Sequence, residues 1–132
     1  ESGLAGVSGV SSDMREITAA AKQGNEKAIL SLEMYEQRIT KYVGAFAAEM
    51  GGVDIIVFTG GVGEHQSSTR ANVCNPLRFM GVEIDDAAND ANNGDEGIIS
   101  TPNSAVKVVV IPTDEEYMIA KDTEAIIEGR EP

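Results

Sequence analysis

The chain has 132 residues, 42% hydrophobic and 24% charged, which is long enough and apolar enough for one globular domain with its own core. Its net charge of −12 opposes a nucleic-acid partner and an anionic membrane surface, because both need clustered Lys and Arg side chains. A single cysteine excludes an intrachain disulfide, and the lack of a signal peptide or a membrane-length apolar run favours a cytoplasmic protein.

The N-terminal region is expected to be a loop followed by a short helix. Residues 1–10, "ESGLAGVSGV", are small and glycine-rich, which is typical of a loop. A helix is then predicted over residues 13–23, with Ser11 or Ser12 as its N-cap and Gly24 directly after its end.

A long helix and a buried strand are predicted next. Apolar side chains recur at helical spacing from Ile29 to Met50, after Asn25 as a cap and before Gly51 as a stop. Residues 53–58, "VDIIVF", are apolar almost throughout, so they are expected to form a central strand buried on both faces.

This strand leads directly into "TGGVGE", residues 59–64, which is expected to be a tight glycine turn. A helix should follow, with Ser67 or Ser68 as its N-cap. Pro76 should kink this helix or end it early, because proline has no N–H to donate.

The second half of the chain is predicted to hold three strands, a loop and a closing helix. The strands are expected at residues 82–84, 98–101 and 106–111, the solvated loop at 85–97, and the helix after a cap at Thr113. The apolar strands 53–58 and 106–111 should lie side by side and parallel. The fold class is therefore α/β, with helices layered on a mixed sheet.

Gly60, Gly61 and Gly63 would let backbone amides approach a phosphate without a clash from a Cβ atom. The stretch lacks the Gly-Lys-Ser/Thr of a P-loop and the third spaced glycine of a dinucleotide fingerprint. Spacing alone leaves a ligand site and a plain tight turn equally open. The three glycines follow the carboxyl end of a central strand, which is where open α/β sheets bind ligands.

Three other features carry less information by themselves. The acidic stretch "PTDEE", residues 112–116, could hold a hard cation, but acidic first turns usually compensate the helix dipole, which is the favoured interpretation. His65 is the only histidine and is interpreted as a loop residue, and Cys74 as a small buried hydrophobe.

Four segments, taken in order, resemble C-terminal segments of the acetate kinase family: "SGVSSDMRE", "RITKYVGAFAAEMGGVDIIVFTGGVGEH", "GVEID" and "VVVIPTDEEYMIAKDT". The resemblance covers nearly all 132 residues of this chain but only about the last third of an enzyme of that family. It implies an incomplete, three-layer, ribonuclease-H-like lobe, with residues 1–132 as a single domain of a longer protein. It also implies ATP, acetate and Mg²⁺ as ligands, transfer of the ATP γ-phosphoryl group to acetate, a cytoplasmic location and a homodimer.

The resemblance also assigns residues. Asp13, Met14 and Arg15 match a triplet that contacts adenosine in the family. The family's second nucleotide-contacting loop is matched by Gly61, Val62, Gly63, Glu64 and His65, although the family commonly has Asn at the last of these positions. Glu115 matches an acidic residue that the family uses near Mg²⁺, which reverses the interpretation of that helix start as dipole compensation alone.

The family's catalytic groups match no position of this sequence. We therefore assign no catalytic residue to the chain, and expect it to supply nucleotide contacts and to be inactive by itself. Propionate or butyrate kinase is an alternative function, as is a non-catalytic α/β binding or assembly module.

Overall fold

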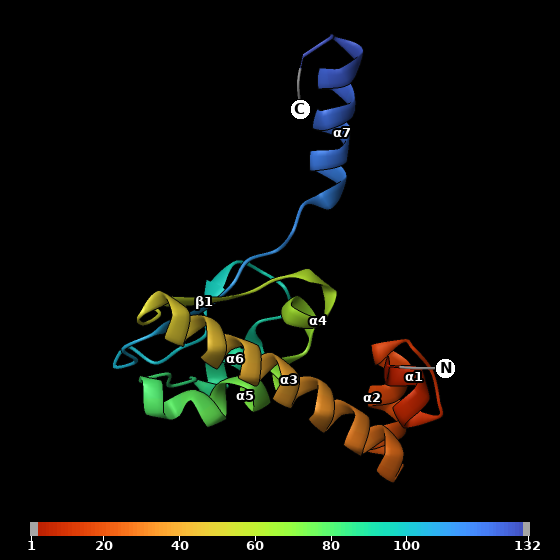
Figure 1. Cartoon of the computed structure of the whole chain (residues 1–132), viewed down its shortest axis with the longest axis vertical. Helices are drawn as coiled ribbons and strands as arrows, with labels where there is room; N and C mark the ends of the chain where they lie inside the picture. The colour runs from red at the N-terminus through yellow and green to blue at the C-terminus, as the bar shows by residue number, and fades with distance from the viewer. Residues whose placement is uncertain (1–2, 131–132) are drawn as a thin grey trace.

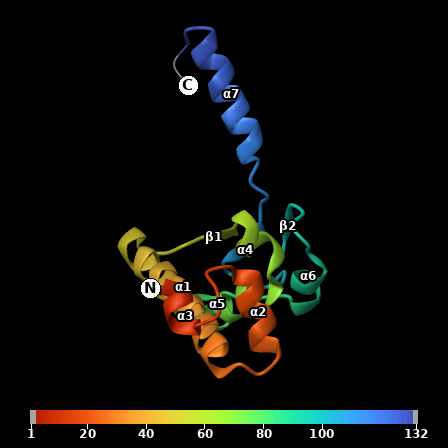
Figure 2. The same cartoon turned by 90° about the vertical axis from the view of Figure 1, so that its right-hand side faces the viewer.

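The computed structural model describes residues 3–130, in which the last helix projects away from the body formed by the other elements (Figures 1 and 2). In chain order the elements are α1 (Gly3–Ser8), α2 (Met14–Lys22), α3 (Glu26–Met50), β1 (Ile55–Phe58), α4 (Gly60–His65), α5 (Ser67–Cys74), the 3-10 helix η1 (Asn75–Met80), α6 (Asp86–Ala91), β2 (Gly97–Ile98), β3 (Lys107–Val110) and α7 (Glu115–Ile127). The chain is thus of mixed α/β class, as the sequence predicts.

The first three helices pack together at one end of the body. The expected loop over residues 1–10 is wrong for the described part, because Gly3–Ser8 forms α1 and packs against α3. Tertiary contact with the long helix outweighs the weak helical preference of a glycine-rich segment. The cap of α2 also differs from the prediction: it is Asp13, whose side chain accepts from the Arg15 amide.

The long helix α3 is confirmed with both of its predicted ends. The side chain of Asn25 accepts hydrogen bonds of 3.1 Å from the amides of Lys27 and Ala28, which satisfies two free donors of the first turn. Gly51 ends the helix in the left-handed conformation at φ 75°. Among residues 3–130, no helix combines the length and the apolar character that crossing a membrane requires.

The sheet has the order β1-β3-β2 and is mixed. Strands β1 and β3 pair in parallel, with Ile55 opposite Lys107 and Phe58 opposite Val110, which confirms the predicted neighbours. Strand β2 runs antiparallel to β3. The expectation that β1 is buried on both faces is wrong, because Ile55 and Val57 are 52% and 48% exposed. The described helices cover only the other face, so the lobe is incomplete.

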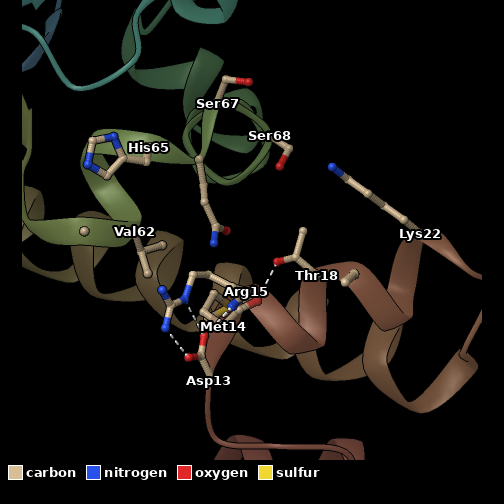
Figure 3. A pocket seen from close by; sticks show the side chains of 12 residues that line it. Asp13, Met14, Arg15, Thr18, Lys22, Val62, His65, Ser67 and Ser68 are labelled. Carbon is tan, nitrogen blue, oxygen red and sulfur yellow. Dashed lines mark hydrogen bonds and ion pairs between the residues drawn. The ribbon is translucent and has the colours of Figure 1, made fainter.

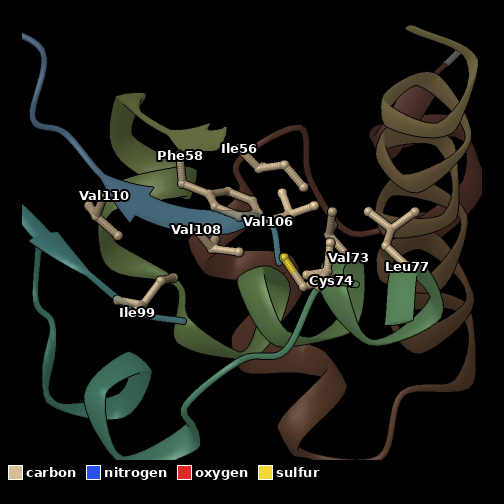
Figure 4. Packing of buried hydrophobic residues seen from close by; sticks show 10 residues of the cluster. Ile56, Phe58, Val73, Cys74, Leu77, Ile99, Val106, Val108 and Val110 are labelled. Atoms are coloured by element: carbon tan, nitrogen blue, oxygen red, sulfur yellow. The ribbon is translucent and has the colours of Figure 1, made fainter. Parts of the chain in front are cut away.

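The hydrophobic core lies between the covered face of the sheet and the helices α3, α5 and η1 (Figure 4). The sheet contributes alternate side chains such as Ile56, Phe58 and Val108, while Val73 and Leu77 come from α5 and η1. Cys74 lies in this core and is 1% exposed, and burial raises the pKa of its thiol to about 12. Its interpretation as a buried hydrophobe is confirmed.

Helix α5 begins and ends near the predicted points. Its N-cap is Gln66 rather than either serine. The α-helix stops at Cys74, and the chain continues through Pro76 as the 3-10 helix η1, so the predicted early end is confirmed. The last helix, α7, is capped by Asp114 rather than Thr113 and extends away from the body (Figures 1 and 2).

The segment between η1 and β3 is the least well predicted. The expected strand over residues 82–84 is reduced to two isolated bridges, of Val82 with Val106 and of Ile84 with Ser100. The expected solvated loop over residues 85–97 contains helix α6, and the strand expected over residues 98–101 is the shorter β2, Gly97–Ile98. Helix α6 forms because Asp85 caps it, through a 3.0 Å bond from the Ala88 amide, and because the side chain of Asn89 accepts a hydrogen bond from the buried Arg70.

Candidate functional site

The glycine-rich stretch after β1 is a short helix, α4, rather than the predicted tight turn. Gly60 begins it at φ 69°, a conformation that side-chain-bearing residues rarely adopt. A Cβ atom placed on Gly60 or Gly61 would meet no other atom within 4 Å. The backbone of these two residues is therefore open to a ligand.

One wall of the site is the start of α2. The Oδ1 atom of Asp13 accepts from the Arg15 amide at 2.8 Å, and the Arg15 guanidinium bonds back to both carboxylate oxygens, at 3.1 and 2.6 Å. The guanidinium and then the amide lower the pKa of Asp13 to about 2. This pairing holds Arg15 against the helix start, although its side chain is 88% exposed.

A cavity of about 710 Å³ separates this wall from α4 and the start of α5 (Figure 3). The residues that line it are Asp13, Met14, Arg15, Thr18, Ala19, Lys22, Gly61, Val62, His65, Gln66, Ser67 and Ser68. The structure thus brings together the two segments that the sequence singled out, the α2 start and the α4 helix. In Figure 3 the side chain of Lys22 extends across the cavity toward Ser68.

Thr18, Lys22 and the first residues of α5 were missed by sequence reasoning. A signal for two of them exists: Thr18 and Lys22 follow Arg15 at i+3 and i+7, so they share its face of α2. The residues of α5 carry no such signal, because only the folded chain brings α5 next to α2.

Two of the predicted site residues face the protein rather than the cavity. A Cβ atom on Gly63 would lie 3.3 Å from the carbonyl carbon of Phe58, so this glycine permits close packing of α4 on β1. Glu64 is buried, and its Oε1 atom accepts from the amide and the hydroxyl of Thr113, at 2.9 and 3.0 Å. The Thr113 amide is the main cause that holds the pKa of Glu64 below its ordinary value.

His65 lies at the end of α4 with an exposed imidazole. Its Nε2 atom is 3.9 Å from the Oε2 atom of Glu64. The ring also contacts the loop after α6, where a Cβ atom on Gly94 would lie 2.5 Å from the His65 ring. The histidine therefore lies between its own helix and the segment after α6.

A second hollow of about 410 Å³ adjoins the first and shares Gly61 with it. It is lined by Gly60, Gly61, Thr113, Asp114, Glu115 and Glu116. Glu115 therefore lies across from the open glycine backbone, at the start of α7.

The acidic hollow fits part of a magnesium site. The Oδ1 atom of Asp114 already accepts from the Tyr117 amide at 3.0 Å as a helix cap, and residues 3–130 contain no group of three His, Cys, Asp or Glu side chains placed to hold a metal. Mg²⁺ is usually bound through one or two carboxylates together with substrate phosphates and water. Glu115 is exposed and can supply one such carboxylate.

Comparison with known proteins identifies the family. The acetokinase family matches residues 1–121. The chain belongs to the acetokinase family. Acetate kinase from Porphyromonas gingivalis is 60% identical over 127 residues, which cover 96% of this chain and 32% of that enzyme.

Solved structures agree with this assignment. A crystal structure of the Porphyromonas gingivalis acetate kinase superposes with a TM-score of 0.86 over 96% of this chain and 32% of that one, at 60% identity. A propionate kinase from Francisella tularensis superposes with a TM-score of 0.80 at 36% identity, over 92% of this chain and 30% of that one. The acetokinase fold is thus conserved in this chain, which spans about a third of the length of the relatives that it matches.

Proposed function

We propose that the complete protein is an acetate kinase, which transfers the γ-phosphoryl group of ATP to acetate and releases acetyl phosphate and ADP. Residues 1–132 would be its C-terminal portion, a single domain that supplies nucleotide contacts and is inactive by itself. The observation that carries this proposal is the cavity shared by two distant segments, Asp13–Arg15 and α4. Family membership supplies the chemistry.

In this proposal the adenosine occupies the larger cavity, beside Asp13, Met14 and Arg15. Gly61 belongs to both hollows, so a nucleotide that extends past it would carry its phosphates toward the acidic one. The open backbone of Gly60 and Gly61 allows the close approach that a phosphate requires. Val62 and His65 would contact the nucleotide, while Gly63 and Glu64 keep α4 in place.

Mg²⁺ would be held with the help of Glu115 and would neutralise charge on the phosphates. Phosphoryl transfer depends mainly on positioning and on such neutralisation. What this chain contributes is therefore the orientation of the nucleotide, through the two walls of the cavity. A carboxylate at the start of α7 also fits this role because the Glu64 contact with Thr113 fixes the preceding residues against α4.

The second candidate is a kinase for propionate or butyrate. The superposition with a propionate kinase at 36% identity supports this candidate. Initial rates of the complete protein with acetate, propionate and butyrate at equal concentrations distinguish these three kinase activities. A non-catalytic assembly module would show no phosphoryl transfer to any of them.

The wider context follows the family. We propose a cytoplasmic location and a homodimer for the complete protein, with ATP and acetate as its small-molecule partners. Light scattering on a sizing column measures the oligomeric state directly.

The nucleotide site is tested by Gly61→Ala in the complete protein, with ADP and Mg²⁺ as the probe in calorimetry. Gly61 lies in a helix with a negative φ, so alanine should fold without strain. Its methyl group would stand between the phosphate and the backbone, and loss of one charge-assisted hydrogen bond should raise the Kd about tenfold.

Gly44→Ala is the matched control, because Gly44 lies in α3, away from both hollows, and also has open space for a methyl group. Its Kd for ADP should stay that of the unchanged protein. Equal ADP affinity in both variants would contradict the assignment of the glycine helix to the phosphates.

A further inference from the structure

Arg70 is a fully buried charged residue in the middle of α5, with 0% of its surface exposed. Burying a guanidinium is costly unless its donors are all satisfied. In the described part of the chain it forms no ion pair with a carboxylate, and its partners are instead backbone and amide oxygens. Burial lowers the pKa of Arg70 from its ordinary value, and the charge of Asp90 opposes this effect.

The guanidinium joins the last turns of two helices. Its Nη1 atom donates to the carbonyl oxygens of Gly63 and Glu64 in α4, at 2.9 and 2.7 Å. Its Nη2 atom donates to the carbonyls of Asn89 and Asn92 at the end of α6, at 2.8 and 3.0 Å. Carbonyls in a last helical turn have no partner within the helix, so one cation satisfies both ends at once.

Asn89 extends this contact back to the cavity. It is 1% exposed, and its Oδ1 atom accepts from Nε of Arg70 at 2.7 Å. Its Nδ2 atom donates to the carbonyl of Ser67 at 2.9 Å. Ser67 is the first residue of α5 and lines the cavity.

The pair therefore touches both parts of one cavity wall. Arg70 holds the end of α4, which carries Gly61, Val62 and His65, and Asn89 holds the start of α5. Neither side chain lines the cavity itself. The contact of the His65 ring with Gly94 adds a third link between this wall and the segment after α6.

We infer that Arg70 and Asn89 are positioning residues for the nucleotide, which set the placement of the α4–α5 wall without touching the ligand. This inference rests on the proposed function. It assigns a role to α6, which forms the outer support of the site although its sequence is that of a solvated segment. Nucleotide affinity should therefore depend on a pair that lies behind the wall.

The test is Asn89→Asp in the complete protein. Aspartate keeps an oxygen for Nε of Arg70 and adds a favourable charge, but it loses the donor to the Ser67 carbonyl and places two oxygens against each other. The start of α5 should move, while the Arg70 contact survives. We expect the Kd for ADP with Mg²⁺ and the KM for ATP to rise roughly tenfold. The KM for acetate should stay the same.

Asn103→Asp is the matched control, since it makes the same chemical change at an exposed loop position. It should leave both constants unchanged. A second variant, Arg70→Lys, keeps the charge but cannot reach four carbonyls with one nitrogen, so it should weaken nucleotide binding and also lower the Tm.

The outcomes separate the two proposals. A lower Tm for Asn89→Asp with an unchanged Kd for ADP would overturn the positioning role and leave a purely structural one. If the protein without substitutions binds no ADP, the proposed function and this inference are overturned together. Normal ADP binding by the unchanged protein with tenfold weaker binding by Asn89→Asp supports both.

Discussion

Glu36 is a buried acid on α3 whose carboxylate accepts two hydrogen bonds, both from α5. Its Oε1 atom accepts from the Thr69 hydroxyl at 3.1 Å and its Oε2 atom accepts from Nδ2 of Asn72 at 2.9 Å. These bonds favour the carboxylate, but burial opposes it more strongly and raises the pKa of Glu36 above its ordinary value. The charged form is thus less stable in the folded protein than in the unfolded chain.

The consequence is a pH dependence of stability. Below the ordinary pKa of 4.5, Glu36 is neutral in the folded and in the unfolded protein, and its contribution to the free energy of unfolding is fully present. That contribution is lost as the pH rises through the raised pKa of the folded state. In Glu36→Gln the new amide oxygen can accept from Asn72, while its NH2 group donates to the Thr69 hydroxyl, which then donates to Gln66. This variant carries no charge, so it should be more stable than the unchanged protein at pH 8, by on the order of 1 kcal/mol.

Urea unfolding at pH 5 and pH 8 measures this difference in the free energy of unfolding. The advantage of Glu36→Gln should grow between the two pH values. Glu49→Gln is the control, because Glu49 is exposed near the other end of the same helix and, unlike Glu33, does not contribute to the raised pKa of Glu36. Its replacement should not alter the pH dependence. A Glu36→Gln advantage that is the same at both pH values would argue against a raised pKa.

At the scale of elements, the sequence predicts those that carry their own local signals. Helix α3 has a side chain that caps its start and a glycine that ends it, and the structure keeps both. Its apolar stripe is only partly covered, because Tyr42, Phe46 and Met50 are 52%, 55% and 66% exposed. Strands β1 and β3 are apolar runs, and they pair as expected. Whether both faces of β1 are covered depends on other segments, so this could not be predicted from the strand itself.

The elements missed are those that depend on distant contacts. Helix α4 is rich in glycine and α6 is rich in Asp and Asn, which both have poor helical preference. Both end against Arg70, a contact that no local pattern indicates. The site residues were likewise assigned from the family resemblance, because Asp13 and Gly61 lie far apart in sequence and meet only in the fold.

The link between α4 and α7 yields a prediction at this scale. Glu64→Ala removes the acceptor for both Thr113 donors, so the Thr113 amide loses its partner. Amide exchange of the peptide around residues 112–117 should speed up about tenfold, measured by mass spectrometry. The same link should weaken in acid, because the lowered pKa of Glu64 makes its stabilisation present above 4.5 and lost as the pH falls through the folded value.

Thr113→Val provides the matched comparison, since valine keeps the amide bond to Glu64 and loses only the hydroxyl bond. Its exchange should rise less than that of Glu64→Ala. Equal protection in all three proteins would mean that other contacts hold the start of α7.

At the scale of the whole molecule, two apolar surfaces stand open in addition to the exposed apolar side chains of α3, such as Phe46 and Met50. One is the uncovered face of the sheet, with Ile55 and Val57 about half exposed. The other is α7, where Ile119, Ile126 and Ile127 are 66%, 66% and 80% exposed on a helix that leaves the body (Figure 1). Soluble monomers rarely expose contiguous apolar patches of this kind. The chain also spans about a third of the length of its acetate kinase relatives.

These surfaces predict a difference between the 132-residue chain and the complete protein. We expect the chain alone to bind the dye ANS several-fold more strongly per molecule and to elute from a sizing column as associated species. Replacing Ile126 and Ile127 together by Lys in the chain alone should reduce both effects, because these side chains lie on the projecting helix and outside the core. A monomeric chain with little dye binding would show that α7 and the open sheet face are covered within the chain itself.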